Sequence, residues 1–403
     1  MSIGNGADHE VPEIDLTDGE VLRDPFSAYG RVRERSPVAR IVARGFPSMW
    51  AATRHDGARA MLADPRFELN AGSYLRPEVP EGCLAYMRTM QEMDGPEHLR
   101  LRRLVSPAFS ARRAAELRTR IERIVGRLLD ELAGHAVDGA VDLLPRFARP
   151  LPIEVIAELV GIPEADRPRW RAYGAAVASG HGQEFADAIP GIMEDAKSAV
   201  ARRRAEPADD LLSDLIRAQA EDRDRLSDAE LVTLVWHLVL AGQVPTNLIA
   251  NAVETLLRHP DQLATLRADT SLMPRAVEEL LRWCGPQLLT IPRYAREDVE
   301  LGGVLIRKGE PVTAAIVSAN RDPRAFADPD RLDVTRPAGP RGHLGFAHGP
   351  HFCLGAPLAR VETEVALTAI LRRFPDLAPA SPVAVTRTPD PGTWRLSALP
   401  VTV

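Results

Sequence analysis

The sequence predicts a mainly α protein with a minor β region. Three long stretches, at 97–109, 111–135 and 231–242, carry apolar residues at the spacing of helix faces. Two shorter stretches, at 38–53 and 298–320, hold β-branched runs interrupted by glycine-containing turns, which is typical of strands and hairpins. The helical stretches are longer and more regular, so we expect strands to form only a small part of the fold.

The length of 403 residues alone would suggest two or three domains, but the chain shows no boundary between them. No internal repeat and no low-complexity linker interrupts the chain, and the proline- and glycine-rich stretch 335–357 holds motif residues. We expect residues 1–19 to form an N-terminal extension and residues 20–403 to form the single domain.

Composition and charge narrow the class of protein. Hydrophobic residues make up 45% and charged residues 26% of the chain, as in ordinary soluble proteins, and the net charge of −6 gives no sign of nucleic-acid binding. The N-terminus lacks the pattern of a secretory signal, and no run of about 18 apolar residues occurs. Three scattered cysteines do not suggest a disulfide framework. We expect a cytoplasmic monomer with no membrane anchor.

One central helix is expected to run from Asp228 to Arg258. Ser227, followed three residues later by Glu230, matches a capping box and marks its start. The segment is apolar nearly all round, as expected of a helix through the middle of a large domain, and would be roughly 45 Å long. Pro245 lies inside this helix, where a proline costs roughly 3 kcal/mol. The position therefore needs an explanation.

The segment "FAHGPHFCLGAP" is the most specific motif in the chain. Cys353 lies between Gly349 and Gly355, seven residues after Phe346, and Pro357 then opens an amphipathic helix. A cysteine just before a helix N-terminus is stabilised as a thiolate by the helix dipole and by free N–H groups. Flanking glycines let the backbone approach a flat ligand closely. On these residues alone, a buried structural cysteine is the alternative.

With its neighbours, the pattern Phe-x-x-Gly-x-x-x-Cys-x-Gly resembles the haem-thiolate loop of the cytochrome P450 family. The resemblance implies the fold of that family, with haem b between the long central helix and the cysteine loop and its helix. It implies that Cys353 is the axial ligand of the iron, where a thiolate donates electron density that favours O–O cleavage. In this resemblance Phe346, Gly349 and Gly355 shape the loop, and His351 takes the place of a haem-propionate partner.

Two further segments extend the resemblance. "EHLRLRR" places His98 and Arg102 at i,i+4, and "IPRYARED" contains Arg293. Taken alone, these side chains would suggest a solvated basic surface. The resemblance implies that all three bind haem propionates, and arginine suits this task because its planar fork can donate two parallel hydrogen bonds to a carboxylate.

A structural cluster is also expected. "EELLRW" places Glu279 and Arg282 at i,i+3 on a helix, which resembles the Glu-x-x-Arg motif of the family. Arg331, in "DPDRLD", resembles the third member of the family's buried Glu-Arg-Arg cluster. Leu332 stands where phenylalanine is commoner, which is a mild departure.

The central helix departs more strongly. The family carries Ala/Gly-Gly-x-Asp/Glu-Thr over the haem, where the acid and the hydroxyl relay protons, whereas this chain reads "AGQVPT". Proline has no N–H, and its ring displaces the carbonyl one turn back. We hypothesise that this freed carbonyl, of Ala241, holds a water above the iron. A kink without a catalytic role is the alternative. The candidate catalytic residues are Ala241, Gly242, Gln243, Val244 at the acid position, Pro245 at the alcohol position, and Thr246.

The missing acid–alcohol pair leaves three kinds of reaction open. The first is monooxygenation, with protons from ordered water or from a hydroxyl of the substrate. The second is oxidative coupling, in which hydrogen is abstracted from an aromatic O–H or N–H and no oxygen enters the product. The third is peroxide use, which ranks lowest because Val244 cannot hold a carboxylate as the arginine of the family's fatty-acid peroxygenases does.

We expect an oxidoreductase of secondary metabolism that uses dioxygen to oxidise an apolar or aromatic natural product. C–C or C–N coupling of an aromatic cyclic dipeptide is one specific hypothesis. A hydroxylase or epoxidase of a macrolide or terpene is the alternative, and a non-catalytic haem sensor or carrier is the last.

The sequence contains no flavin or iron–sulfur motif, so we expect electrons from NAD(P)H to arrive through a ferredoxin reductase and a ferredoxin. The arginines of "LRLRRL" and "SARRAAELRTR" could form a basic face for that partner, or could simply be solvated. By their position in the family, the residues lining the substrate pocket should include Val239, Leu288, Leu289, Ile291 and Trp394, although each could equally be core.

Overall fold

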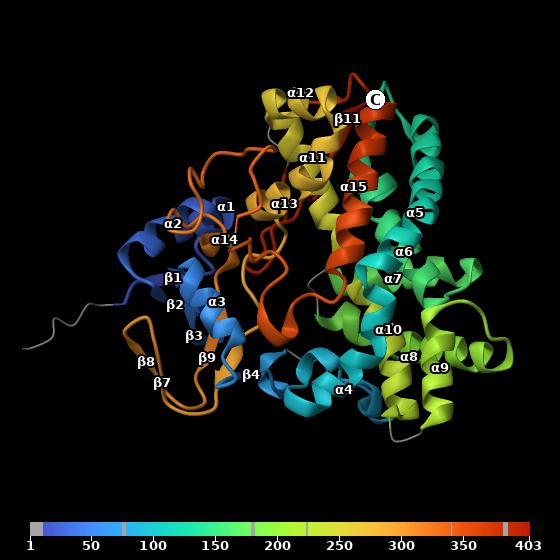
Figure 1. Cartoon of the computed structure of the whole chain (residues 1–403), viewed down its shortest axis with the longest axis horizontal. Helices are drawn as coiled ribbons and strands as arrows, with labels where there is room; N and C mark the ends of the chain where they lie inside the picture. The colour runs from blue at the N-terminus through green and yellow to red at the C-terminus, as the bar shows by residue number, and fades with distance from the viewer. Residues whose placement is uncertain (1–10, 75–77, 179–181, 223–224, 340, 382–385) are drawn as a thin grey trace, which may run out of the picture.

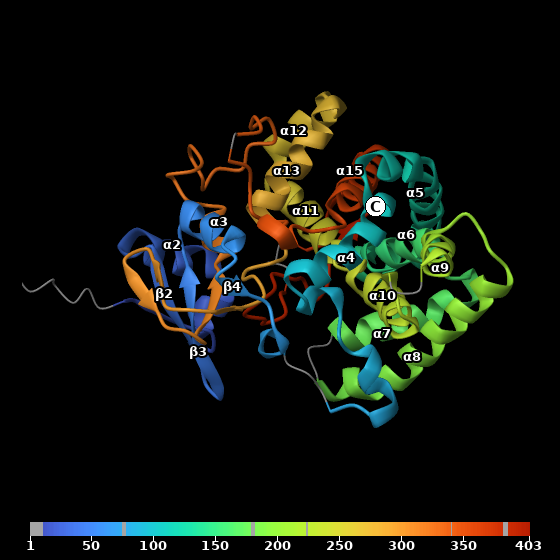
Figure 2. The same ribbon diagram turned by 60° about the horizontal axis from the view of Figure 1, so that its bottom comes forward.

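The computed structural model describes residues 11–74, 78–178, 182–222, 225–339, 341–381 and 386–403. Helices dominate this part of the chain, and a smaller β region lies at one side of the molecule (Figures 1 and 2). The prediction of a mainly α fold with a minor β region is confirmed. Residues 1–10 of the expected N-terminal extension lie outside the described residues.

A mixed six-stranded sheet forms the β region, in the order β1-β2-β3-β9-β6-β4. Two of its pairs, β1–β2 and β3–β9, are parallel and the other three are antiparallel. Because residues 13–15 already pair with β2, the structure corrects the expected domain boundary at residue 20. The strands are β1 (Glu13–Asp15), β2 (Val38–Ala43), β3 (Phe46–Ala52), β9 (Pro311–Ala314), β6 (Arg293–Ala295) and β4 (Phe67–Glu68).

Smaller β elements and short helices complete the fold. Some lie in the β region, and others lie in the helical region. A hairpin and a three-stranded sheet, β10-β11-β5, accompany the main sheet. The hairpin is β7 (Val299–Leu301) with β8 (Val304–Ile306); the small sheet is β5 (Ala140–Asp142), β10 (Ala378–Pro379) and β11 (Pro400–Thr402). The helices around the main sheet are α1 (Gly19–Arg23), α2 (Pro25–Arg35), α3 (His55–Ala63) and α14 (Ile316–Ala319).

The helical region holds the largest hydrophobic core, into which most long helices turn apolar faces. Figure 2 shows these helices gathered opposite the sheet. They are α4 (Gly95–Val105), α5 (Ala111–Leu132), α6 (Pro150–Val160), α7 (Arg167–Ala178), α8 (Gly182–Ala205), α9 (Leu211–Glu221), α10 (Asp228–Ala241), α11 (Pro245–Arg258), α12 (Pro260–Ala268), α13 (Met273–Cys284) and α15 (Ala356–Arg373).

The expected central helix is two helices. The capping box is confirmed, since Ser227 and Glu230 exchange side-chain to backbone hydrogen bonds of 2.8 and 3.2 Å. However, α10 ends at Ala241, residues 242–244 form turns, and α11 begins at Pro245. The physical reason is that proline has no N–H to continue the helical ladder, whereas it is well tolerated in a first turn.

The pair α10–α11 is also the one described segment long and apolar enough to cross a membrane, with a mean hydropathy of 1.3 in its most apolar window. Most of that window, 56%, is buried inside the protein. Its apolar composition is therefore explained by its place in the core, against helices α6, α7 and α8.

Two ion pairs hold α15, the helix that follows the cysteine loop. Arg360 binds Glu278 of α13 at 2.5 and 3.0 Å, and Glu364 accepts from Arg118 of α5 at 2.8 Å. The buried face of α15 packs along α5, which carries a continuous apolar stripe. This packing fixes the position of Cys353, three residues before the helix begins.

Candidate functional site

The loop before α15 presents the sulfur of Cys353. The Cys353 N–H donates to the carbonyl of Phe346 at 2.9 Å, which closes the loop. Gly349 has a φ of +77°, and a Cβ there would overlap the carbonyl of Leu62 in α3, so glycine is required. At Gly355 a Cβ would meet no atom within 4 Å. The backbone therefore borders open space immediately after the cysteine.

Cys353 is exposed as a residue, although many protein atoms surround its sulfur. This desolvation raises the pKa of the Cys353 thiol, while the N–H groups of Gly355 and Ala356 and the charge of Arg102 act to lower it. These N–H groups belong to the start of α15, and that of Ala356 also donates to the carbonyl of Cys353 at 3.3 Å. The sulfur thus has donors that favour a thiolate and an open side on which a cation could bind.

A cluster of basic side chains lies beside this loop. His98 is buried and stacks on His351, with 4.1 Å between the ring centroids. Arg102 donates to the carbonyl of Phe352 at 2.5 Å, next to the cysteine. Arg293, which is 4% exposed, comes from β6. The structure therefore brings together the four residues that the sequence suggested as propionate partners.

Asp94 is a member of this cluster that the sequence analysis missed. Its carboxylate binds Nε2 of His351 at 2.9 Å and accepts from the N–H of Leu69 at 2.7 Å. The signal that could have revealed it is its position at the N-cap of α4, one turn before His98. Asp94 fixes the ring of His351.

The charges of the cluster are unbalanced. Burial lowers the pKa values of Arg102 and Arg293, and burial together with the neighbouring His351 and Arg102 lowers the pKa of His98 to about 4. Against these basic groups stands the single carboxylate of Asp94. Buried cations are normally paired, so the cluster fits a ligand that carries carboxylates of its own, as haem does.

The break between α10 and α11 is the second opening. Residues 231–239 and 248–256 are buried, whereas residues 240–247 are half-buried or exposed, and Val244 is 43% exposed. Such a loss of burial in the middle of a core helix indicates space beside it. The residues of the cysteine loop and those of the α10–α11 break therefore fit the haem that the motif implies.

The expected free carbonyl at this break is not free. The carbonyl of Ala241 accepts the N–H of Val244 at 3.3 Å, because the chain tightens to i→i+3 hydrogen bonds before Pro245. Thr246 is half-buried and donates its own N–H to the carbonyl of Gln243 at 3.1 Å. A carbonyl has two lone pairs, so Ala241 keeps one for a further donor.

Two neighbours of Ala241 face other helices. A Cβ on Gly242 would overlap Ile156 of α6, so glycine allows α10 and α6 to approach closely. The side-chain amide of Gln243 lies against Gly174 of α7, where a Cβ would also overlap it. The side chain of Gln243 therefore lies towards α7.

The structural cluster around Glu279 contains a different third arginine. Arg282 binds both oxygens of Glu279 at 2.7 and 2.8 Å, and Arg336 binds Oε2 at 3.0 Å. Arg331 is exposed, and only its backbone carbonyl takes part, accepting from Arg282 and Arg336. The prediction of Arg331 is wrong because the chain curls around the ion pair and brings in the guanidinium five residues later.

Two of the expected pocket residues are packed in cores. Val239 is 0% exposed and belongs to the helical core, and Leu288 belongs to the core between the sheet and α2. Trp394 meets Phe26 edge to face at 5.3 Å. Leu289 is half-buried and Ile291 is 37% exposed. Val239 and Trp394 are therefore explained by packing, and Ile291 is the most accessible of the five.

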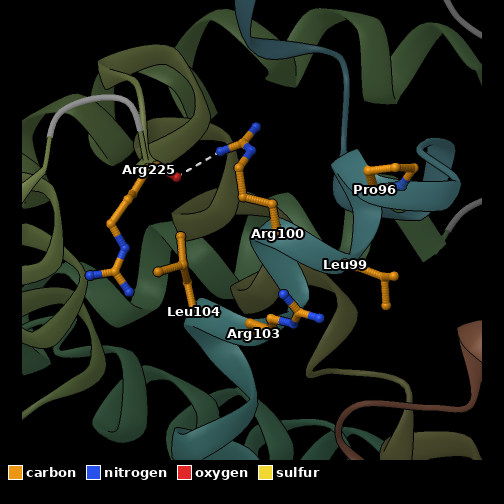
Figure 3. A pocket seen from close by; sticks show the side chains of 6 residues that line it. All are labelled: Pro96, Leu99, Arg100, Arg103, Leu104 and Arg225. Atoms are coloured by element: carbon orange, nitrogen blue, oxygen red, sulfur yellow. Dashed lines mark hydrogen bonds between the residues drawn. The ribbon is translucent and has the colours of Figure 1, made fainter.

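A surface pocket of about 360 Å³ lies on the other side of α4, shown in Figure 3. Arg100 crosses it and donates to the carbonyl of Arg225 at 2.7 Å. Its lining also includes Pro96, Leu99, Arg103 and Leu104. Arg102 faces the cysteine loop and is not part of this pocket.

Together, the fold and the cysteine site define a haem-thiolate oxidoreductase. The family model for cytochrome P450 matches residues 177–386. The chain is 42% identical over 403 residues to cytochrome P450 107B1 of Saccharopolyspora erythraea, covering 97% of this chain and 96% of the relative. It is 42% identical over 384 residues to the 6-deoxyerythronolide B hydroxylase of the same organism, covering 91% and 92%.

A solved structure, that of the cytochrome P450 enzyme CxnD for C–S bond formation in chuangxinmycin biosynthesis, superimposes with a TM-score of 0.86 at 34% identity, covering 99% of this chain and 98% of that one. The chain belongs to the cytochrome P450 family. Family membership implies haem as the cofactor and an oxidoreductase activity.

Proposed function

We propose that the protein is a monooxygenase of secondary metabolism that inserts oxygen into an apolar natural product bound between the α10–α11 break and the Cys353 loop. The observation that carries this proposal is the pairing of a cysteine sulfur facing open space with a buried basic cluster that lacks enough carboxylates. The similarity to a macrolactone hydroxylase supports the substrate class.

Different residues would hold different parts of the cofactor. Cys353 would bind the iron, and the basic cluster of His98, Arg102, Arg293 and His351 would hold the propionates. Haem bound there supplies the activation of dioxygen, with two electrons from outside the chain. Asp94 keeps the ring of His351 oriented, and Arg102 braces the loop through the carbonyl of Phe352.

Proton supply is the point at which this chain differs from the family pattern. Val244 and Pro245 offer no acid and no hydroxyl at the break. The remaining lone pair of the Ala241 carbonyl can hold a water, and Thr246 lies one residue further along the first turn of α11. We infer that protons travel through ordered water or through a hydroxyl of the substrate itself.

Oxidative coupling is the second candidate. The missing acid–alcohol pair favours it, because coupling needs hydrogen abstraction rather than oxygen insertion, and the similarity to CxnD adds a relative that forms a C–S bond. An aromatic cyclic dipeptide remains the specific substrate hypothesis for this reaction.

Electrons would come from NAD(P)H through a ferredoxin reductase and an acidic ferredoxin in the cytoplasm. Many of the arginines expected to form a basic face are paired within the protein, such as Arg100 with Glu230 and Arg118 with Glu364. Arg103 is exposed, and with Arg225 it lines the surface pocket of Figure 3. The outer side of α4 is therefore the basic surface that supports this partner.

Substrate class is tested by titrating the purified ferric haem protein with macrolactones, terpenes, fatty acids and aromatic cyclic dipeptides and following the Soret shift. A shift with a macrolactone or terpene, followed by isotopic oxygen from labelled dioxygen in the product of a ferredoxin- and NADPH-driven reaction, is the expected result. A shift with a cyclic dipeptide and an unlabelled product would establish coupling instead. The absence of both NADPH consumption and product in both series would contradict an enzymatic role.

A further inference from the structure

His237 is a buried polar side chain with no partner. It lies in α10, is 8% exposed, and neither Nδ1 nor Nε2 has a hydrogen-bond partner in the described part of the chain. Its nearest ring contact is Trp236, edge to face at 5.9 Å, which satisfies neither nitrogen. A buried polar group without a hydrogen bond destabilises a protein, so its presence calls for a ligand.

Two side chains of α10 close to His237 bind a neighbouring segment. Thr233 and Trp236 both donate to the carbonyl of Tyr86, at 3.1 and 3.0 Å, and so bind the short helix η2 (Glu81–Tyr86). Lys197 of α8 lies over the ring of Tyr86 at 4.5 Å and holds the same segment.

Two residues just after α10 contact two further helices. Gly242 meets Ile156 of α6, and Gln243 meets Gly174 of α7. At 3.6 residues per turn, Gly242 and Gln243 lie on other sides of the helix than His237.

His237 lies on the same face of α10 as Thr233, which binds η2 one turn earlier. It precedes Ala241 by one turn, so the two side chains lie on the same face, and Val244, two turns after His237, continues it into the exposed break. Val239, by contrast, lies on nearly the opposite face, in keeping with its place in the core. The unpartnered imidazole therefore lies one turn from the half-exposed break between α10 and α11.

We propose that His237 is a specificity-determining residue whose imidazole hydrogen-bonds a hydroxyl or carbonyl group of the bound substrate. This inference rests on the proposed function and deepens it. The substrate is then an apolar molecule with an oxygen function remote from the oxidised carbon, such as a hydroxylated macrolactone, and not a plain hydrocarbon.

The charge state of the ring narrows the ligand further. Burial lowers the pKa of His237 to about 4, so at neutral pH the ring is uncharged, with one N–H donor and one acceptor nitrogen. A hydroxyl can satisfy either nitrogen and a carbonyl can accept from the N–H. A substrate carboxylate would find no cation here.

The test compares cyclododecanol, cyclododecanone and cyclododecane, which share a ring but differ in the oxygen function. Dissociation constants are measured from the Soret shift of the haem-loaded protein. His237→Phe keeps a ring of similar size and should lose about tenfold in affinity for the alcohol and the ketone, with no loss for the hydrocarbon. His237→Asn, which keeps a donor and an acceptor, should restore part of the alcohol affinity.

The matched control is Thr233→Val, which removes a hydrogen bond one turn earlier on α10 and should leave the alcohol-to-hydrocarbon ratio unchanged. The melting temperature of His237→Phe should equal or exceed that of the wild type, because an unpaired polar group is removed. Equal losses for all three compounds, no loss, or no binding would overturn the inference while the thiolate-type carbon monoxide spectrum remained. Absence of that spectrum from the wild type would overturn the proposed function as well.

Discussion

At the scale of single residues, the carboxylate of Glu279 organises the chain around it. It accepts from Arg282 and Arg336 and also from the N–H of Asp333 at 3.0 Å. Arg282 in turn donates to the carbonyl of Asn320 at 2.9 Å. All of these contacts are inaccessible or nearly so, which makes the loss of one partner costly because a charge is left buried.

Replacing Arg336 or Arg331 tests which of the two is the third member of the cluster around Glu279. Arg336→Leu should destabilise the protein by roughly 3 kcal/mol and reduce haem retention, because Glu279 loses an ion pair in a buried setting. Arg331→Leu, the control, should change stability by no more than about 0.5 kcal/mol, because its side chain is exposed. Urea unfolding measures both, and the reverse ranking would show that Arg331 belongs to the cluster.

Sequence and structure agree on single residues where a motif is local. The loop from Phe346 to Gly355 has its chemistry within ten residues, so its pattern alone identified Cys353. Arg336 was missed because its role depends on how a loop curls back, and His237 was missed because its sequence neighbours are ordinary core residues. The path of a loop and the absence of a hydrogen-bond partner appear only in the folded structure. The spacing of residues in the sequence does not reveal them.

At the scale of elements, Pro245 answers the question that the sequence raised. It converts one long core helix into two, with i→i+3 hydrogen bonds at the junction and a half-exposed stretch at residues 240–247. The helical pattern on each side is regular, so the sequence predicted both helices and the cap at Ser227. It did not predict the break, because apolar periodicity continues through residues 242–244.

Pro245→Ala should rejoin α10 and α11. The new N–H can take the Ala241 carbonyl in place of the 3.3 Å bond from Val244, for a gain of about 1 kcal/mol in local helix stability. Amide hydrogen exchange should slow at residues 241–246, and less product should form per NADPH consumed, since the opening narrows.

The control for this change is Pro260→Ala, which replaces another first-turn proline, at the start of α12. It should leave product yield per NADPH unchanged. If Pro245→Ala behaves like this control in both exchange and yield, the break has no role in the reaction.

At the scale of the whole molecule, the site lies where the β region and the helical region meet. Arg293 comes from the sheet, His98 and Arg102 from α4, and His351 from the loop that leads into α15. The Arg293 guanidinium also donates to the carbonyl of Leu62 in α3 at 2.7 Å, so it ties the sheet region to the same helix that Gly349 approaches. These segments are far apart in the sequence.

The fold class could be predicted from the helical patterning of the sequence. The family could be predicted from one compact motif. The assembly of the basic cluster could be expected only through the family resemblance, since no local pattern links residues 98, 293 and 351. The placement of pocket residues depends on side-chain packing across both regions, which explains why Val239 and Leu288 turned out to be packed in cores.

The central claim is that Cys353 is the thiolate ligand of a haem held at this meeting of the two regions. The direct measurement is the carbon monoxide spectrum of the reduced, haem-loaded protein, compared with Cys353→Ser and with Cys284→Ser, whose buried sulfur donates to the carbonyl of Leu280. The account predicts a thiolate-type spectrum in the wild type and in Cys284→Ser, and its loss in Cys353→Ser. An unchanged thiolate-type spectrum in Cys353→Ser would contradict it.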